Sequence, residues 1–196
     1  GETVVDEHSD VTVLFADIVG FTAMAARSRP DQILDLLNKL FAAFDEITAR
    51  HGLEKIKTIG DCYMAAGGVF DHQGAHASAM ADLALAMQEA AARIDDPDGQ
   101  PVRIRIGIHV GGLTAGVIGQ RRFMYDLWGD TVNIASRMLS LGEPDCIQVS
   151  DDLRRRLDSS YRLDPRGEID VKGKGAMSTW YLLGRDGGIN AEEDVS

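Results

Sequence analysis

Cysteine is scarce in this sequence of 196 residues, and a long apolar run is missing from it. The two cysteines, Cys62 and Cys146, are far apart and show no CxxC spacing, which argues against a disulfide scaffold or a cysteine zinc module. No segment reaches the roughly 18 continuous apolar residues of a membrane span. Residues 1–10 are too acidic and polar for a signal peptide. We therefore expect free thiols in a reducing compartment.

Basic residues are fewer than acidic ones, with 20 Lys and Arg compared with 31 Asp and Glu. The net charge is therefore -11 and the pI is near 4.8. A general nucleic-acid partner needs a basic face that releases counterions, so we expect none. The GxxxxGK[ST] pattern is missing, which argues against a P-loop nucleotidase. A small anionic ligand can still bind where basic residues cluster locally.

The sequence has the 44% hydrophobic and 26% charged content of an ordinary globular domain. Its periodicities predict helices and strands. Helices are expected at residues 30–51, 75–94, 130–141 and 151–157. Strands are expected at residues 11–16, 55–59, 63–66, 102–110, 113–118, 123–128, 147–149, 168–171 and 178–183, with Gly111 and Gly112 as a turn.

This order predicts an α+β fold, a ferredoxin-like α/β sandwich in which helices pack on one face of a mostly antiparallel sheet. We place one domain at residues 11–184, between a leader at 1–10 and an acidic tail at 185–196 that we expect to be disordered. Because the chain lacks an initiating methionine, we interpret it as part of a longer protein.

Two aspartates follow apolar strands, Asp17 after residues 11–16 and Asp61 in the turn after 55–59. Alone, Asp17 is equally well a helix cap or turn residue, and Asp61 the usual second residue of a Gly-Asp turn. Together, two carboxylates at one sheet edge can hold two magnesium ions about 3.5–4 Å apart. Phosphate chemistry is therefore the first hypothesis.

Five ordered motifs carry a family resemblance. They are FADIVGFT at residues 15–22, EKIKTIGDCYM at 54–64, RIGIHVG with AGVIG at 105–111 and 115–119, YDLWGDTVNIASRM at 125–138, and VKGKG at 171–175. This set resembles the catalytic domain of class III nucleotide cyclases. The resemblance implies an enzyme that makes a cyclic nucleotide and pyrophosphate from a nucleoside triphosphate.

The resemblance implies that Asp17 and Asp61 bind two Mg²⁺ or Mn²⁺ ions, helped by the backbone carbonyl of Ile18. It implies that Asn133 orients the ribose and that Arg137 stabilises the transition state. Four residues apart, these two side chains share one helix face, although an Asn and an Arg so spaced are more often merely solvated. An arginine suits this role because its permanent charge follows charge developing on phosphoryl oxygens.

Lys172 matches the family's phosphate lysine and Arg121 its second phosphate contact. Lys174 and Arg122 are weaker matches, and each of the four could instead belong to a solvated turn. A KGKG loop between short strands is a plausible anion cradle in its own right.

Lys57 and Asp126 occupy the two positions at which the family reads the purine. Adenine offers an acceptor at N1 and a donor at N6, which a lysine and an aspartate complement, so ATP is the expected substrate. Guanylyl cyclases resemble this segment but carry glutamate at the first position and typically cysteine at the second. Read without the family, Lys57 is an exposed strand lysine and Asp126 a strand-end cap.

The family's active site lies between two catalytic domains paired head to tail, and this chain carries both sets of residues, so the resemblance implies a homodimer with two composite sites. We expect a cytoplasmic location, either free or as the cytosolic catalytic part of a membrane-anchored protein, and no membrane contact by these residues. The alternatives are a guanylyl cyclase and a catalytically silent nucleotide-binding or dimerisation module. A zinc site at His72 and His76 lacks a third ligand.

Overall fold

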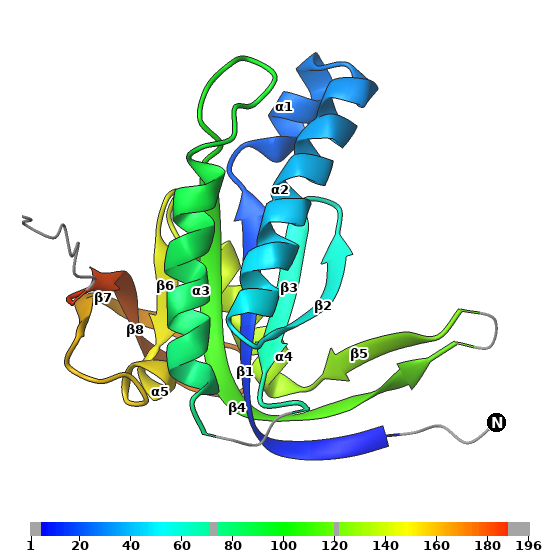
Figure 1. Ribbon diagram of the computed structural model, residues 1–196. Coiled ribbons are helices and arrows are strands. Elements are labelled where there is room, and N and C mark those ends of the chain that lie inside the picture. The colour runs from blue at the N-terminus through cyan, green and yellow to red at the C-terminus, as the bar shows by residue number, and fades with distance from the viewer. Residues whose placement is uncertain (1–4, 71–73, 120–121, 188–196) are drawn as a thin grey trace, which may run out of the picture.

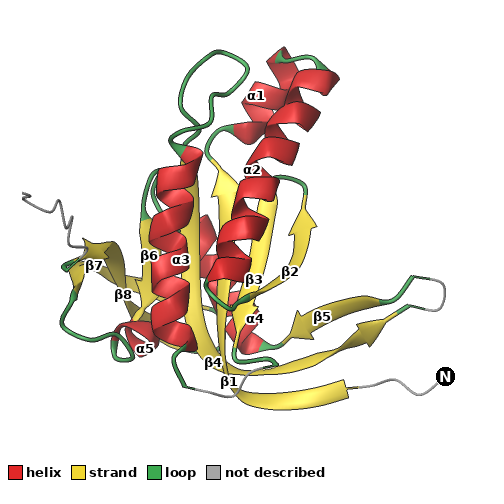
Figure 2. Cartoon of the chain, viewed as in Figure 1, coloured by secondary structure: helices red, strands yellow, loops and turns green. Residues whose placement is uncertain are grey.

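The computed structural model describes residues 5–70, 74–119 and 122–187. Within these ranges it has an eight-stranded sheet in the order β2-β3-β1-β4-β6-β8-β7, and β5 pairs with β4 beside this path. Every pairing is antiparallel except the one between β4 and β6. The expected α+β architecture with a mostly antiparallel sheet is confirmed (Figures 1 and 2).

The strands are β1 (Val5–Ile18), β2 (Glu54–Ile59), β3 (Cys62–Gly67), β4 (Ile104–Ile118), β5 (Met124–Trp128), β6 (Ile147–Ser150), β7 (Tyr161–Val171) and β8 (Gly175–Arg185). The helices are α1 (Phe21–Arg27), α2 (Pro30–Arg50), α3 (His76–Ala91), α4 (Asp130–Ser140) and α5 (Asp151–Arg154). Helix α1 was missed because its seven residues bury only Met24 and therefore show little periodicity. None of the helices in the described ranges is long and apolar enough to cross a bilayer.

Helices cover both faces of the sheet, so the prediction of a single covered face was wrong. On one face, Leu40 and Phe44 of α2 pack with α3 and with Leu14 of β1. On the other face, Ala135 of α4 packs against Val13 of β1. Alternate side chains of a strand point to opposite faces, so β1 supplies both cores. In Figure 1, α2 and α3 lie in front of the sheet and α4 lies behind it.

Gly111 and Gly112 do not form the expected turn, because β4 runs through them as one strand. They instead let α4 approach the sheet closely. A Cβ on Gly111 would lie 2.6 Å from the Thr131 hydroxyl oxygen, and that hydroxyl donates to the carbonyl of Gly112 at 2.6 Å. Glycine here removes a steric barrier rather than supplying a special backbone angle.

Strand β1 begins at Val5, so residues 5–10 of the supposed leader belong to the sheet. Their polar side chains gave no apolar run, and they form a strand because they pair with the far half of β4, with Val5 opposite Gly116. The far half of β4, β5 and the start of β1 extend away from the sheet body as a three-stranded arm (Figure 1). Arg185 of the predicted tail lies in β8, and residues 188–196 fall outside the described ranges.

Candidate active site

The strand order brings Asp17 and Asp61 to one edge of the structure. Asp17 is the next-to-last residue of β1, and Asp61 follows Gly60 at the tip of the β2–β3 hairpin. Gly60 has φ +57°, a left-handed angle that glycine adopts without strain. The backbone N–H of Ile18 donates to Asp61 Oδ2 at 3.1 Å, which joins the two segments directly.

The local environment raises the pKa of Asp61. Burial is the main cause, the charge of Asp17 adds to it, and the Ile18 N–H opposes it. Burial next to the same carboxylates raises the pKa of the Cys62 thiol to about 12, so in the absence of metal the thiol is protonated at neutral pH.

Arg105 is the site residue that sequence reasoning missed. It lies opposite Asp17 in the β1–β4 register and binds both carboxylate oxygens, Nε to Oδ1 at 3.1 Å and Nη2 to Oδ2 at 2.7 Å. In the sequence, Arg105 resembles any polar residue of an alternating strand. The available signal was its place at the start of β4, beside the strand that ends in the first carboxylate.

The Lys57 ammonium and the Asp126 carboxylate form an ion pair, with Nζ 2.7 Å from Oδ2. The side chains are only 26% and 14% exposed, so this pair is far less solvated than a typical surface pair. The N–H of Leu127 donates to the other carboxylate oxygen at 2.8 Å and fixes its orientation. The structure therefore brings together a donor and an acceptor that are 69 residues apart in the sequence.

A pocket of about 340 Å³ lies between α4 and the β7–β8 hairpin. It is lined by Asp130, Asn133, Ile134, Arg137, Val171, Lys172 and Lys174. The Arg137 guanidinium reaches the carbonyl of Asp170 at 3.5 Å, and Lys174 Nζ lies 3.3 Å from Asp130 Oδ2. The expected ribose, transition-state and phosphate residues thus share one pocket, apart from Arg121.

Arg121 and His72 lie outside the described residues, and Arg122 is exposed. His76 is buried, with its ring nitrogens 2.7 Å from the Thr12 hydroxyl and 3.2 Å from Asp10. Among the described residues, no group of three or more His, Cys, Asp or Glu side chains could hold a metal ion. The arrangement around His76 therefore gives no support to a zinc site.

The Asp17 and Asp61 pair fits a hard divalent cation. Both donors are carboxylates, their charges interact, and they lie at a strand end and a hairpin tip, where phosphate or water oxygens could complete the coordination. Such a pair would hold Mg²⁺ or Mn²⁺ only together with ligands from elsewhere, as is usual for Mg²⁺ at nucleotide phosphates.

Comparison with known proteins identifies the family of this sequence. Residues 3–184 match the family model described as the adenylate and guanylate cyclase catalytic domain. An adenylate cyclase of Mycobacterium tuberculosis (strain ATCC 25618 / H37Rv) is 50% identical over 182 residues, which are 93% of this chain and 41% of the mycobacterial protein. The rat guanylate cyclase soluble subunit beta-2 is 43% identical over 190 residues, 96% of this chain and 27% of that protein. The chain thus spans less than half of either relative.

Solved structures of cyclase catalytic domains have a similar fold. The crystal structure of the catalytic core of a rhodopsin-guanylyl cyclase with converted specificity, in complex with ATPalphaS, matches with a TM-score of 0.89 at 36% identity, over 94% of this chain and 100% of that one. The family model covers nearly the whole sequence, so this chain belongs to the family of adenylate and guanylate cyclase catalytic domains.

Proposed function

We propose that this domain is an adenylyl cyclase that converts ATP to 3′,5′-cyclic AMP and pyrophosphate. The observation that carries the choice of base is the Lys57–Asp126 ion pair. It presents an ammonium donor for adenine N1 and a carboxylate acceptor for the N6 amino group. Guanine has an N–H at N1, which would face the ammonium, and a carbonyl at position 6, which would face the carboxylate. Both mismatches leave polar groups unpaired in a largely desolvated place.

Asp17 and Asp61, with the carbonyl of Ile18, are the residues that would hold two Mg²⁺ or Mn²⁺ ions. The ions supply a lower pKa for the ribose 3′-hydroxyl and neutralise charge on the triphosphate. In the reaction, the ribose 3′-oxygen forms a bond to the α-phosphorus, and the bond between the α-phosphorus and the oxygen that bridges it to the β-phosphate breaks. The proton of the 3′-hydroxyl leaves to solvent. Pyrophosphate carries away the electron pair of the broken bond.

The protein's own groups then bind and orient the substrate. Asn133 can hydrogen-bond the ribose, which keeps the 3′-oxygen in line with the α-phosphorus. Arg137 donates to the oxygens on which charge develops, and Lys172 binds the terminal phosphates. Arg105, already paired to Asp17, is placed to meet phosphates that arrive with the metal. Arg121 is retained as a second phosphate contact by resemblance alone.

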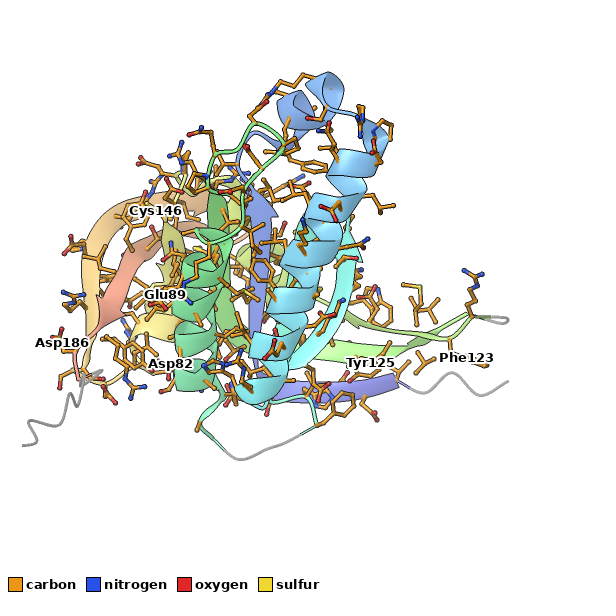
Figure 3. All side chains as sticks on the ribbon, turned by 45° about the horizontal axis from the view of Figure 1, so that its top comes forward. Asp82, Glu89, Phe123, Tyr125, Cys146 and Asp186 are labelled. Carbon is orange, nitrogen blue, oxygen red and sulfur yellow. The ribbon has the colours of Figure 1, made fainter. Side chains whose placement is uncertain are left out.

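The active site is proposed to form between two copies of the chain, paired head to tail. Among the described residues, no hydrogen bond or ion pair joins Asp17 or Asp61 to the α4 pocket or to the Lys57–Asp126 pair. We propose that the metal carboxylates form one half-site and the base- and ribose-binding residues the other, and that a second chain sets one against the other. The exposed arm, where Phe123 is 76% and Met124 55% exposed, offers apolar surface for this contact (Figure 3).

A guanylyl cyclase is the second candidate, because guanylyl cyclases are among the similar proteins. It is disfavoured by Lys57 and Asp126. A silent nucleotide-binding or dimerisation module is the third, and it is disfavoured because neither metal carboxylate nor Asn133 or Arg137 is replaced. We expect the domain to act in the cytoplasm, whatever else the whole protein contains.

The proposal is tested by incubating the purified chain with ATP or GTP, in Mn²⁺ and in Mg²⁺, over a series of protein concentrations. Cyclic AMP formation that requires metal, rises steeply with protein concentration and disappears in Asp17→Ala would support a dimeric adenylyl cyclase. Preference for GTP would favour the second candidate. No product at any concentration would contradict both enzymatic readings.

A further inference from the structure

The pocket beside α4 contains one acidic side chain among its basic ones. Arg137, Lys172 and Lys174 are cationic, and only Asp130 is anionic, so the pocket is locally positive in a chain of net charge -11. The anion faces the cation at the hairpin tip, with Asp130 Oδ2 3.3 Å from Lys174 Nζ. This pair has no part in the function proposed above.

The hairpin that carries Lys174 closes in a short turn that contains two glycines at positive φ. Val171 pairs with Gly175, and the N–H of Lys174 donates to the carbonyl of Val171 at 2.8 Å. Gly173 and Gly175 have φ of +83° and +76°, angles that other residues rarely adopt. The turn therefore places Lys172 and Lys174 at the tip of the hairpin, between β7 and β8.

Besides the Arg137 hydrogen bond to the carbonyl of Asp170, apolar packing and an ion pair join this hairpin to α4. Near its end, Val171 and Ile169 pack with Ile134 and Met138 in a small apolar cluster. At its tip, the Asp130–Lys174 ion pair crosses the edge of the pocket. The side chains of this pair remain 72% and 46% exposed, and an exposed pair of this kind contributes little to stability. Any role of this pair therefore follows from its position at the edge of the pocket and not from a contribution to the stability of the fold.

We propose that Asp130 is a positioning residue that holds Lys174 at the pocket edge until a triphosphate binds. Lys174 then exchanges the single carboxylate for oxygens of the terminal phosphates, and it returns to Asp130 when pyrophosphate leaves. Because the ion pair is weak and solvated, the exchange costs little, whereas a polyphosphate offers several negative charges at once. Asp130 thereby limits how tightly the pocket retains its anionic product.

This inference rests on the proposed function for its substrate, but it can be tested separately with pyrophosphate. Asp130→Asn should lower both the KM for ATP and the inhibition constant of pyrophosphate by about two- to fivefold, because one exposed, weakly interacting opposing charge is lost. Lys174→Met should raise both constants by a similar factor. In both variants the larger change should lie in KM and in the inhibition constant rather than in kcat, since the pair does not touch the reacting atoms.

The double variant Asp130→Asn/Lys174→Met is the decisive measurement. If Asp130 acts through Lys174, the double variant should behave as Lys174→Met alone. If Asp130→Asn lowers the inhibition constant equally with Met at position 174, Asp130 acts only through the total charge of the pocket, and the proposal is overturned. An unchanged constant in Asp130→Asn overturns it as well. Lys174→Arg, which retains the cation, should bind pyrophosphate about as tightly as the wild-type chain does.

The exposed pair Asp35–Lys39 on α2 provides matched controls, since its atoms are 2.7 Å apart and both side chains are 63% exposed. Asp35→Asn and Lys39→Met make the same charge changes away from the pocket and should leave the constants unaltered. Calorimetric titration of each variant with pyrophosphate in Mg²⁺ repeats the test without turnover. If the wild-type chain makes no cyclic nucleotide, the proposed function fails, while the titration still decides the role of Asp130.

Discussion

Arg105 donates two hydrogen bonds to Asp17, from Nε and Nη2 to the two carboxylate oxygens. The side chains are 28% and 16% exposed, and the hydrogen bond to Asp17 raises the pKa of Arg105, so the guanidinium stays charged. A metal ion that binds Asp17 therefore competes with a cation of the protein itself. Arg105 also offsets the repulsion between Asp17 and Asp61 in the absence of metal.

Replacing Arg105 should consequently strengthen metal binding to the nucleotide-free protein. We expect Arg105→Met to lower the dissociation constant for Mn²⁺ by about tenfold, because both Asp17 oxygens become free and one nearby positive charge is lost. Titration followed by the electron paramagnetic resonance signal of free Mn²⁺ measures this. Arg103→Met is the control, since Arg103 pairs with the exposed Asp145 instead. Equal affinities in the two variants would contradict the competition.

The Lys57–Asp126 pair should control the choice of base. Lys57→Glu places a second carboxylate against Asp126, and we expect kcat/KM for ATP to fall by at least about 10²-fold. Lys57→Glu/Asp126→Cys removes that repulsion, and GTP should become the better substrate. The control is Lys55→Glu, which makes the same change on the same strand where the lysine pairs with Asp45. Retained ATP preference in the double variant would refute the assignment.

The arm should determine self-association. Phe123→Asp places a charge on a side chain that is 76% exposed, and it should weaken dimerisation while the fold is retained. Activity at a fixed low protein concentration should fall by about tenfold or more and recover as the concentration rises. Analytical ultracentrifugation gives the oligomeric state. Leu34→Asp changes another exposed apolar residue, on α2, and should have no such effect.

Close packing of α4 on β4 should depend on Gly107. A Cβ at this position would lie 2.1 Å from the backbone nitrogen of Leu139, and backbone cannot move aside as a side chain tip can. We expect Gly107→Ala to lower the free energy of unfolding by about 1–3 kcal/mol and to reduce kcat through displacement of α4. Urea denaturation measures the first effect. Gly74→Ala, where the Cβ meets nothing within 4 Å, should be neutral.

His109 should make the fold sensitive to mild acid. Burial lowers its pKa from 6.5 to about 4. The unfolded chain therefore takes up a proton near pH 6.5 and the folded chain only near pH 4, so the free energy of unfolding should fall as the pH drops through this window. The loss is at most about 3 kcal/mol, and it is absent above pH 6.5. His109→Gln should flatten this part of the pH profile, and an unchanged slope would contradict the assignment.

Sequence patterns predicted the local elements that a few neighbouring residues specify. The three- and four-residue apolar steps predicted α2 to within one residue, and the Gly-Asp turn predicted the β2–β3 hairpin. The five motifs indicated the family that the comparisons then confirmed. Patterns failed where a segment depends on distant partners: the start of β1 carries no apolar run, and Gly111 and Gly112 resemble a turn until α4 is seen against them.

By itself, then, the sequence determined most of the local helices and strands, because backbone sterics and side-chain periodicity act over a few residues, and its motifs indicated the family by resemblance. Only the tertiary structure decided which charges meet. Arg105 is 88 residues from Asp17, Asp126 is 69 from Lys57, and Lys174 reaches Asp130 across a pocket. These contacts depend on strand register and on the face of the sheet that α4 covers, and a periodic pattern in one segment specifies neither.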